Sequence, residues 1–263
     1  MGGDFRIAAL FVFYCTLLLP MSTFVAAVRS AAAYVAVSLY VAITAPIGMV
    51  LAILFRWKNL LYMLGHGGVA LGTSLAGIRT RVAGRENLPA GQAVVFCANH
   101  QSNIDPPILF RALHRQLHIL FKKELTKLPL LVNAFQIGGF VPIDRASREQ
   151  SMAAIDEAAL SLRQGNSFLT FPEGTRSRTG ALLPFKRGPF LMALKAQVPV
   201  VPVAVQGGTE SMRRGSRIVR PATVSVRIGA PIPTKGMDLS DRERLADLVK
   251  SRVEELLAMG PVD

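Results

Sequence analysis

The sequence predicts an α/β fold, in which a mixed, largely parallel sheet is flanked by helices and preceded by two N-terminal membrane-embedded helices. Two long uncharged runs open the chain, and each is long enough to cross hydrocarbon. The rest alternates strand-like apolar runs with amphipathic helical runs, which is typical of α/β sandwiches. Polar side chains follow the ends of three predicted strands, where sites of open α/β sheets collect.

The two uncharged runs cover residues 7–28 and 30–55, which are 22 and 26 residues long. At about 1.5 Å per helical residue, each reaches across roughly 30 Å of hydrocarbon. A cleaved signal peptide is the alternative for the first run, with a small-residue site at Ala26 and Ala27. The second run follows at once, so residues 1–58 are predicted to be membrane-anchoring helices. Prolines inside both runs predict kinks, which leaves a hairpin in one leaflet as the alternative to two spans.

Residues 59–77 form a third apolar stretch that contains His66 and five glycines. Glycine weakens a helix, so a third membrane span is not expected here. We expect a helical segment that lies on the membrane surface or packs under the domain.

Residues 78–263 are predicted to form the globular domain. Pro142 favours an edge position for its strand or a place at the strand end, since proline donates no ladder hydrogen bond. Capping-box patterns begin the helices at Ser147 and Ser240. The predicted strands are 78–82, 94–98, 139–144, 167–171, 198–205 and 223–228, and the predicted helices are 107–113, 147–163, 188–196 and 240–257.

The net charge of the chain is +13, and most of it belongs to the residues after 58. A basic domain behind a membrane anchor favours anionic headgroups or polyanionic substrates as partners. Nucleic acid is not expected, because the aromatic residues lie mostly in apolar runs and no nucleic-acid-binding motif occurs. Arg56 and Lys58 follow the second uncharged run, whereas only Arg29 separates the two runs. This asymmetry favours a globular domain on the cytoplasmic face.

Residues 99–105, with the sequence NHQSNID, place a histidine and a carboxylate five residues apart directly after an apolar strand. The unperturbed pKa of imidazole, about 6.5, suits His100 to act as a general base at neutral pH. A carboxylate such as that of Asp105 can hold the required tautomer and stabilise the imidazolium. The alternative is that Asp105 merely caps the helix that begins with Pro106 and Pro107.

Two other strand ends carry arginines, Arg145 after one strand and Arg176 after another. Arginine suits bidentate recognition of phosphate or carboxylate. Gly174 lets the backbone approach a ligand, and Thr175 adds a hydroxyl group. The alternative for each arginine is a solvated side chain or an ion pair with the carboxylate next to it.

These segments resemble the glycerolipid acyltransferase family. Residues 99–105 are similar to its NHxSxxD block, and residues 171–177, FPEGTRS, are similar to its second signature. Residues 139–145, GFVPIDR, and residues 200–203, VVPV, resemble two further blocks, so the resemblance covers roughly 78–232 with the blocks in order. Pro142 departs from the pattern, since the family usually has a bulky apolar residue there.

The resemblance, closest to the bacterial lysophosphatidic acid acyltransferases, implies a membrane-bound enzyme of phospholipid biosynthesis. It would move an acyl group from acyl-CoA or acyl-carrier protein to the sn-2 hydroxyl of 1-acylglycerol 3-phosphate, giving phosphatidic acid. His100 would be the general base and Asp105 its orienting partner. No cofactor or metal is expected beyond the acyl donor, and no acyl-enzyme is required. The cytoplasmic (inner) membrane is the expected location, with the catalytic domain on the cytoplasmic face.

The phosphate of the acceptor would bind beside the strand ends, with Glu173 ordering the loop rather than touching the anion. A relative that acts on another lysolipid, such as lyso-ornithine lipid, is an alternative. A non-catalytic membrane lipid-binding protein is another, although such a protein has no need of both His100 and Asp105. The predicted phosphate-site residues are Arg145, Glu173, Gly174, Thr175, Arg176 and Lys122, with Lys123 as a further candidate.

Overall fold

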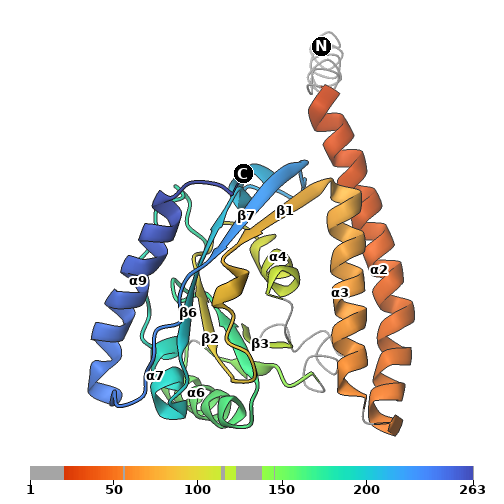
Figure 1. The fold of residues 1–263 in the computed structure, drawn as a ribbon. Helices are drawn as coiled ribbons and strands as arrows, with labels where there is room; N and C mark the ends of the chain where they lie inside the picture. Colours follow the sequence, from red (N-terminus) through yellow and green to blue (C-terminus); the bar gives the residue numbers. More distant parts are fainter. Residues whose placement is uncertain (1–20, 56, 114–115, 123–137, 145, 263) are drawn as a thin grey trace, which may run out of the picture.

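The computed structural model describes residues 21–55, 57–113, 116–122, 138–144 and 146–262. A seven-stranded sheet lies between two layers of helices (Figure 1). One layer contains α6 (Arg148–Arg163), α7 (Gly188–Ala196) and α9 (Arg242–Ala258). The other contains α4 (Asp105–Ala112), and beyond it a pair of N-terminal helices. The predicted α/β class is therefore confirmed.

The sheet has the strand order β1-β7-β6-β2-β5-β3-β4. Every neighbouring pair is parallel except β6 and β7, which confirms a mixed, largely parallel sheet. The strands β2 to β6 consequently present their carboxyl ends at one edge. The strand bounds are β1 Ile78–Ala83, β2 Val95–Ala98, β3 Leu117–Lys122, β4 Val141–Ile143, β5 Ser167–Thr170, β6 Val200–Gln206 and β7 Ala222–Ile228.

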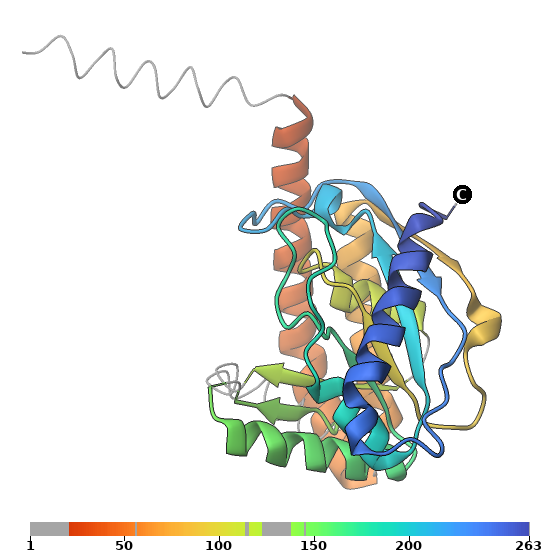
Figure 2. The same cartoon turned by 90° about the vertical axis from the view of Figure 1, so that its left-hand side faces the viewer.

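Alternation along the central strand β2 divides the core into two halves. Phe96 and Ala98 pack with α4 on one face, whereas Val95 and Cys97 face α6, α7 and α9. All four side chains are fully buried, because β2 has a strand on each side and helices on both faces. Figure 2, turned from the first view, shows the C-terminal helix α9 crossing the face opposite the N-terminal helices. The predicted continuous apolar strand thus occupies the centre of the sheet.

Three local predictions have different outcomes. β4 forms the sheet edge, as Pro142 predicts, and Ser147 caps α6 by accepting the Gln150 N–H at 3.2 Å. The capping box predicted at Ser240 is wrong. Asp238 takes that role for the short helix η3 (Leu239–Asp241), which precedes α9. The strand β3 was not predicted, because a histidine and a terminal lysine interrupt its apolar run.

The N-terminal prediction of two separate membrane helices needs correction. The helix α2 (Met21–Phe55) continues through Arg29, the residue expected to separate the two runs, and also through Pro46. Arg29 donates from Nε to the carbonyl of Leu75 at 3.0 Å, which satisfies its guanidinium without a break in the helix. Within the described residues, one helix, Ser22–Phe55, is apolar and long enough to cross a membrane by length and composition. Most of the first predicted run lies outside the described residues.

The glycine-rich stretch 59–77 is helical and forms α3 (Lys58–Ala76), which packs against α2 on one side and α4 on the other. A Cβ on Gly67 would lie 2.6 Å from the hydroxyl oxygen of Tyr40, and one on Gly72 would lie 3.0 Å from Cγ2 of Val37. The Tyr40 hydroxyl crosses to donate to the Leu64 carbonyl at 2.9 Å. Glycine therefore allows the close approach of the two helices, which offsets its low helix propensity.

We expect Gly67→Ala to weaken the contact between α2 and α3, because the added methyl group displaces Tyr40 from its bond to Leu64. Thermal unfolding of the full chain in detergent should show a lower midpoint. Gly65→Ala is the matched control on the same helix, since its Cβ would lie an ordinary 3.6 Å from Phe110. Alanine should be neutral there or stabilise by up to about 1 kcal/mol. Equal midpoints for both variants would contradict the role assigned to Gly67.

Candidate active site

The loops that follow β2, β5 and β6 meet at the carboxyl edge of the sheet. These loops carry His100, Glu173 and Gly208, respectively. The main chain joins the first two loops directly, since Ser177 N–H donates to the carbonyl of His100 at 2.8 Å. The structure thus brings together two blocks that lie about seventy residues apart in the sequence.

His100 and Asp105 are in direct contact, with 3.0 Å between Nδ1 and Oδ2. The imidazole is 17% exposed, whereas the carboxylate is fully buried. The ring of His100 stacks on Phe171, with 4.1 Å between the ring centroids. A proton on Nδ1 that is donated to Asp105 leaves Nε2 as the basic nitrogen. The pair therefore has the geometry of an oriented general base.

The carboxylate of Asp105 does not cap the helix that Asp105 begins. Its Oδ2 atom turns back and accepts the N–H groups of Gln101 and Ser102, each at 2.7 Å. The residue before α4, Ile104, makes no side-chain cap bond. Pro106 and Pro107 have no N–H group, so the first turn of α4 has two fewer donors for a capping side chain to accept. The carboxylate of Asp105 instead accepts hydrogen bonds from the loop before the helix.

Gly208 leaves room for the other oxygen of Asp105. A Cβ at this position would lie 2.4 Å from Oδ1 of Asp105 and 3.1 Å from Cβ of Ser102. Oδ1 is buried and has no hydrogen-bond partner among the described residues. Sequence reasoning missed this glycine, although the Gly207–Gly208 pair at the end of a buried strand is a signal of close backbone approach.

Glu173 holds the backbone of the histidine loop. Its Oε1 atom accepts the N–H of His100 at 2.7 Å, and its Oε2 atom accepts the N–H of Leu183 at 3.0 Å. The side chain is buried, and this burial raises the pKa of its carboxyl above the usual range. With both oxygens bonded to main-chain donors, Glu173 orders the loop and does not face outward as an anion-site residue.

The turn after Glu173 presents the other predicted phosphate-site groups. Thr175 is exposed and Arg176 is half-buried. Gly174 has φ +69°, and a Cβ there would lie 2.9 Å from Nζ of Lys186. The ammonium group of Lys186 therefore lies beside this turn. The sequence analysis did not predict Lys186 as a member of the site. Its position only ten residues after Arg176, in the same loop, was the available signal.

The structure does not describe the side chains of the remaining predicted phosphate-site residues. Arg145 and Lys123 lie outside the described residues. Lys122 is the last residue of β3, at the same sheet edge, but its side chain is also outside the described part. The structure therefore brings together His100, Asp105, Glu173, Gly174, Thr175 and Arg176.

Two other nucleophile-type groups near the histidine are engaged elsewhere. The hydroxyl of Ser102 is fully buried and donates to the carbonyl of Met212 at 2.6 Å. Cys97 is buried in β2 beside Thr170, and burial raises the pKa of its thiol to about 12. A thiol with this pKa carries almost no thiolate at neutral pH. His100 is thus the reactive group that the site exposes.

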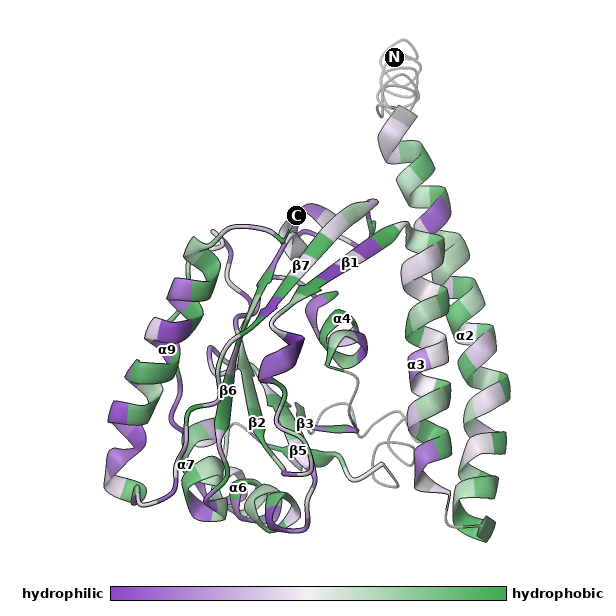
Figure 3. Cartoon of the chain, viewed as in Figure 1, coloured by the Kyte–Doolittle hydropathy of each residue, from purple (hydrophilic) through white to green (hydrophobic). Residues whose placement is uncertain are grey.

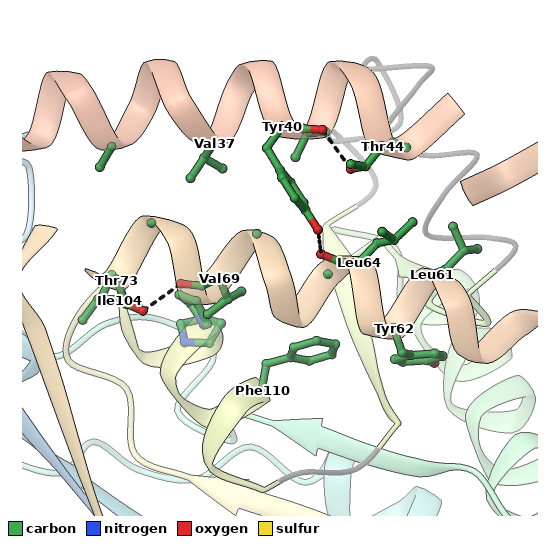
Figure 4. Close-up of a pocket in the computed structure, with 18 of the residues that line it drawn as sticks. Val37, Tyr40, Thr44, Leu61, Tyr62, Leu64, Val69, Thr73, Ile104 and Phe110 are labelled. Atoms are coloured by element: carbon green, nitrogen blue, oxygen red, sulfur yellow. Dashed lines mark hydrogen bonds between the residues drawn. The ribbon is translucent and has the colours of Figure 1, made fainter. Parts of the chain in front are cut away.

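An apolar cavity of about 540 Å³ lies between the N-terminal helices and the domain. Figure 4 shows Val37 and Tyr40 of α2, Val69 of α3 and Phe110 of α4 around it. Ile104, in the loop that ends in Asp105, lines the cavity, so the cavity adjoins the histidine loop. Almost all of its lining is hydrocarbon, which suits an alkyl chain rather than a polar ligand.

Comparison with known proteins places this site in a family. The family model for acyltransferases matches residues 79–206, which include both loops. A 1-acyl-sn-glycerol-3-phosphate acyltransferase from Limnanthes douglasii is 30% identical over 210 residues, which cover 77% of this chain and 72% of that protein. The chain belongs to the acyltransferase family.

Other relatives of this acyltransferase-family chain agree with the assignment. The human 1-acyl-sn-glycerol-3-phosphate acyltransferase alpha is 34% identical over 177 residues, which cover 67% of this chain. The chain spans only 62% of the length of that protein. The crystal structure of the 1-acyl-sn-glycerophosphate (LPA) acyltransferase PlsC from Thermotoga maritima superposes with a TM-score of 0.66. It is 28% identical, with 85% of this chain and 96% of that chain covered.

We expect Gly208→Ala to reduce the activity of the site, because the methyl group would displace the Asp105 carboxylate that orients His100. General-base help typically contributes a hundredfold or more, so a fall of at least about tenfold in kcat is expected. Gly188→Ala is the matched control, since its Cβ would make an ordinary 3.4 Å contact with Ile155. A wild-type kcat and an unchanged melting curve in Gly208→Ala would contradict the proposal that Gly208 leaves room for the Asp105 carboxylate.

Proposed function

We propose that the protein transfers an acyl group from acyl-CoA or acyl-carrier protein to the sn-2 hydroxyl of 1-acylglycerol 3-phosphate. The His100–Asp105 contact at 3.0 Å, on a loop of the acyltransferase family, is the observation that carries this proposal. The names of the Limnanthes, human and Thermotoga relatives support the lysophosphatidate acceptor. No cofactor is required, because the thioester supplies the activated acyl group.

The proposed reaction is a direct transfer. Nε2 of His100 accepts the proton of the acceptor hydroxyl while its oxygen attacks the thioester carbonyl. Asp105 accepts the hydrogen bond of Nδ1–H and stabilises the imidazolium that forms. Collapse of the tetrahedral intermediate breaks the carbon–sulfur bond, and the imidazolium returns its proton to the departing thiolate. The products are an ester and a free thiol, with His100 restored.

The acceptor phosphate is proposed to bind at the turn after β5. Arg176 and Lys186 supply positive charge, the hydroxyl of Thr175 supplies a donor, and Gly174 allows close approach. Arg145 and Lys122 remain proposed members of this site on sequence grounds. The link from Ser177 to His100 keeps this turn at a constant position relative to the general base.

The apolar cavity is proposed to receive an acyl chain beside the reacting centre. It opens among α2, α3 and α4, so a chain can enter from lipid without crossing water. The outer face of α2 supports attachment to a membrane. Figure 3 shows this helix mostly green or pale, with a hydrophilic segment only in its upper part, and Ile43, Ile53 and Leu54 are each more than 60% exposed. The proposed location is the cytoplasmic membrane, with the domain on the cytoplasmic face.

Another lysolipid acceptor, such as a lyso-ornithine lipid, also offers a hydroxyl group for acylation but lacks the glycerol phosphate. The cations around Gly174 favour the phosphate-bearing acceptor over this alternative. The experiment that separates them is an assay of the purified full chain. It crosses lysophosphatidate and lyso-ornithine lipid with acyl-CoA and acyl-carrier protein.

We expect transfer to lysophosphatidate in that assay, and His100→Ala should lower kcat by a hundredfold or more because the base is lost. Asp105→Asn should also lower kcat strongly while the protein remains folded, since an amide favours the wrong tautomer. Circular dichroism and melting curves serve as controls for folding. Turnover near the wild-type rate in His100→Ala would exclude the mechanism, and transfer to lyso-ornithine lipid alone would exclude the acceptor.

Loss of positive charge at the turn should raise KM for lysophosphatidate more than it lowers kcat. We expect Arg176→Gln and Lys186→Gln each to raise this KM by roughly tenfold or more, since a charged hydrogen bond contributes about 1.5–3 kcal/mol and about 1.4 kcal/mol corresponds to a factor of ten. Lys195→Gln is the matched control, because Lys195 forms an ion pair with Asp156 on the opposite layer of helices. An unchanged KM in both test variants would move the phosphate site elsewhere.

A further inference from the structure

The loop between α8 (Gly208–Ser211) and β7 carries four arginines within eight residues, namely Arg213, Arg214, Arg217 and Arg220. Three of them are exposed, and the fourth is half-buried. In the part of the chain that the structure describes, none of the four forms an ion pair with a carboxylate. We call residues 213–220 the arginine loop.

The arginine loop is bound to the apolar helix α2. The Ser30 hydroxyl accepts the Val219 N–H at 2.8 Å, and the Tyr34 hydroxyl donates to the Arg217 carbonyl at 2.8 Å. Val219 itself is buried against the hydrophobic core. These contacts hold the loop at the level of residues 30–34 of the helix. Figure 2 shows this loop, coloured light blue, beside the upper half of α2.

Apolar side chains of α2 are exposed around these contacts. Phe24, Val28 and Val35 are 60%, 53% and 59% exposed. An uncompensated cluster of arginines next to an exposed apolar helix is the composition of a surface that meets the lipid headgroups. Arginine also recognises phosphate bidentately, and anionic leaflets attract basic segments near their surface.

We infer that the arginine loop binds the anionic headgroups of the bilayer. This inference rests on the proposed attachment of α2 to lipid and adds a preference for anionic over zwitterionic membranes. An acidic carrier protein would match the same charge. The hydrogen bonds to α2 favour lipid, because they hold the loop against the helix that the bilayer would contact.

The loop also connects the membrane surface with the candidate site. Arg214 donates from Nη1 to the carbonyl of Arg176 at 2.9 Å, in the turn that is proposed to bind the acceptor phosphate. Headgroups bound to the neighbouring arginines would therefore lie close to that turn. Acceptor lipids in the same leaflet would be presented to the site with their phosphates at the correct depth.

The test uses the full chain, diluted from non-ionic detergent into vesicles and separated by flotation. One set of vesicles contains phosphatidylglycerol, and the other contains only phosphatidylcholine. We expect the wild type to prefer phosphatidylglycerol, and Arg213→Gln with Arg217→Gln to reduce that preference by roughly tenfold or more. Flotation with phosphatidylcholine should not change, since it reports the attachment of α2. Added salt should weaken the preference of the wild type.

Two control variants distinguish positive charge in the arginine loop from positive charge elsewhere on the protein surface. Arg85→Gln with Lys235→Gln removes two positive charges from exposed positions outside the loop and should keep the preference. Arg213→Lys with Arg217→Lys should retain most of it. A double glutamine variant that keeps the wild-type preference for phosphatidylglycerol would overturn the inference. The inference would also be overturned if this variant kept that preference and lost only its binding to acyl-carrier protein. Failure of the wild type to float with either vesicle would instead count against the membrane attachment in the proposed function.

Discussion

The buried carboxylate of Asp105 is the constraint on which the candidate site depends. A charge with no exposure is costly unless donors surround it, and here Oδ2 accepts bonds from the His100 ring and from two main-chain N–H groups. These bonds bend residues 100–102 around the carboxylate. On the other side of the carboxylate, Gly208 at the start of α8 lies so near Oδ1 that it has no space for a side chain. One carboxylate thus determines the form of the histidine loop and the residue opposite it.

Glu173 supports the same loop from the other side. It accepts the N–H of His100, so the histidine is held through its ring by Asp105 and through its backbone by Glu173. The side chain of Glu173 is buried, and this burial raises the pKa of its carboxyl. Main-chain donors in both loops offset that cost. Two strand-end loops consequently behave as one rigid unit, which is what a general base needs if its ring is to remain oriented toward a substrate.

The N-terminal helices α2 and α3 bring an apolar environment to these two loops. Glycines of α3 permit close contact with α2, and the far side of α3 rests on α4, the helix that begins with Asp105. The cavity between them is therefore bounded by α2 on one side and by the histidine loop on the other. The arginine loop returns to α2 at Ser30 and Tyr34. Apolar and cationic surfaces, contributed by distant parts of the chain, thus lie around one sheet edge.

Local patterns were sufficient for the α/β class, most strands and helices, and the histidine and carboxylate themselves, because periodicity, strand ends and short motifs depend on neighbours in sequence. The edge position of Pro142 also followed from the missing N–H of proline. Tertiary contacts decided the rest. Asp105 serves its loop rather than its helix, Glu173 binds the backbone of His100, and Gly208 and Lys186 join the site from other strands and loops. The glycines of α3 lower its helix propensity, and only the structure shows that they make room for side chains of α2. Each of these outcomes depends on which atoms approach across long sequence separations, and local propensity does not encode that.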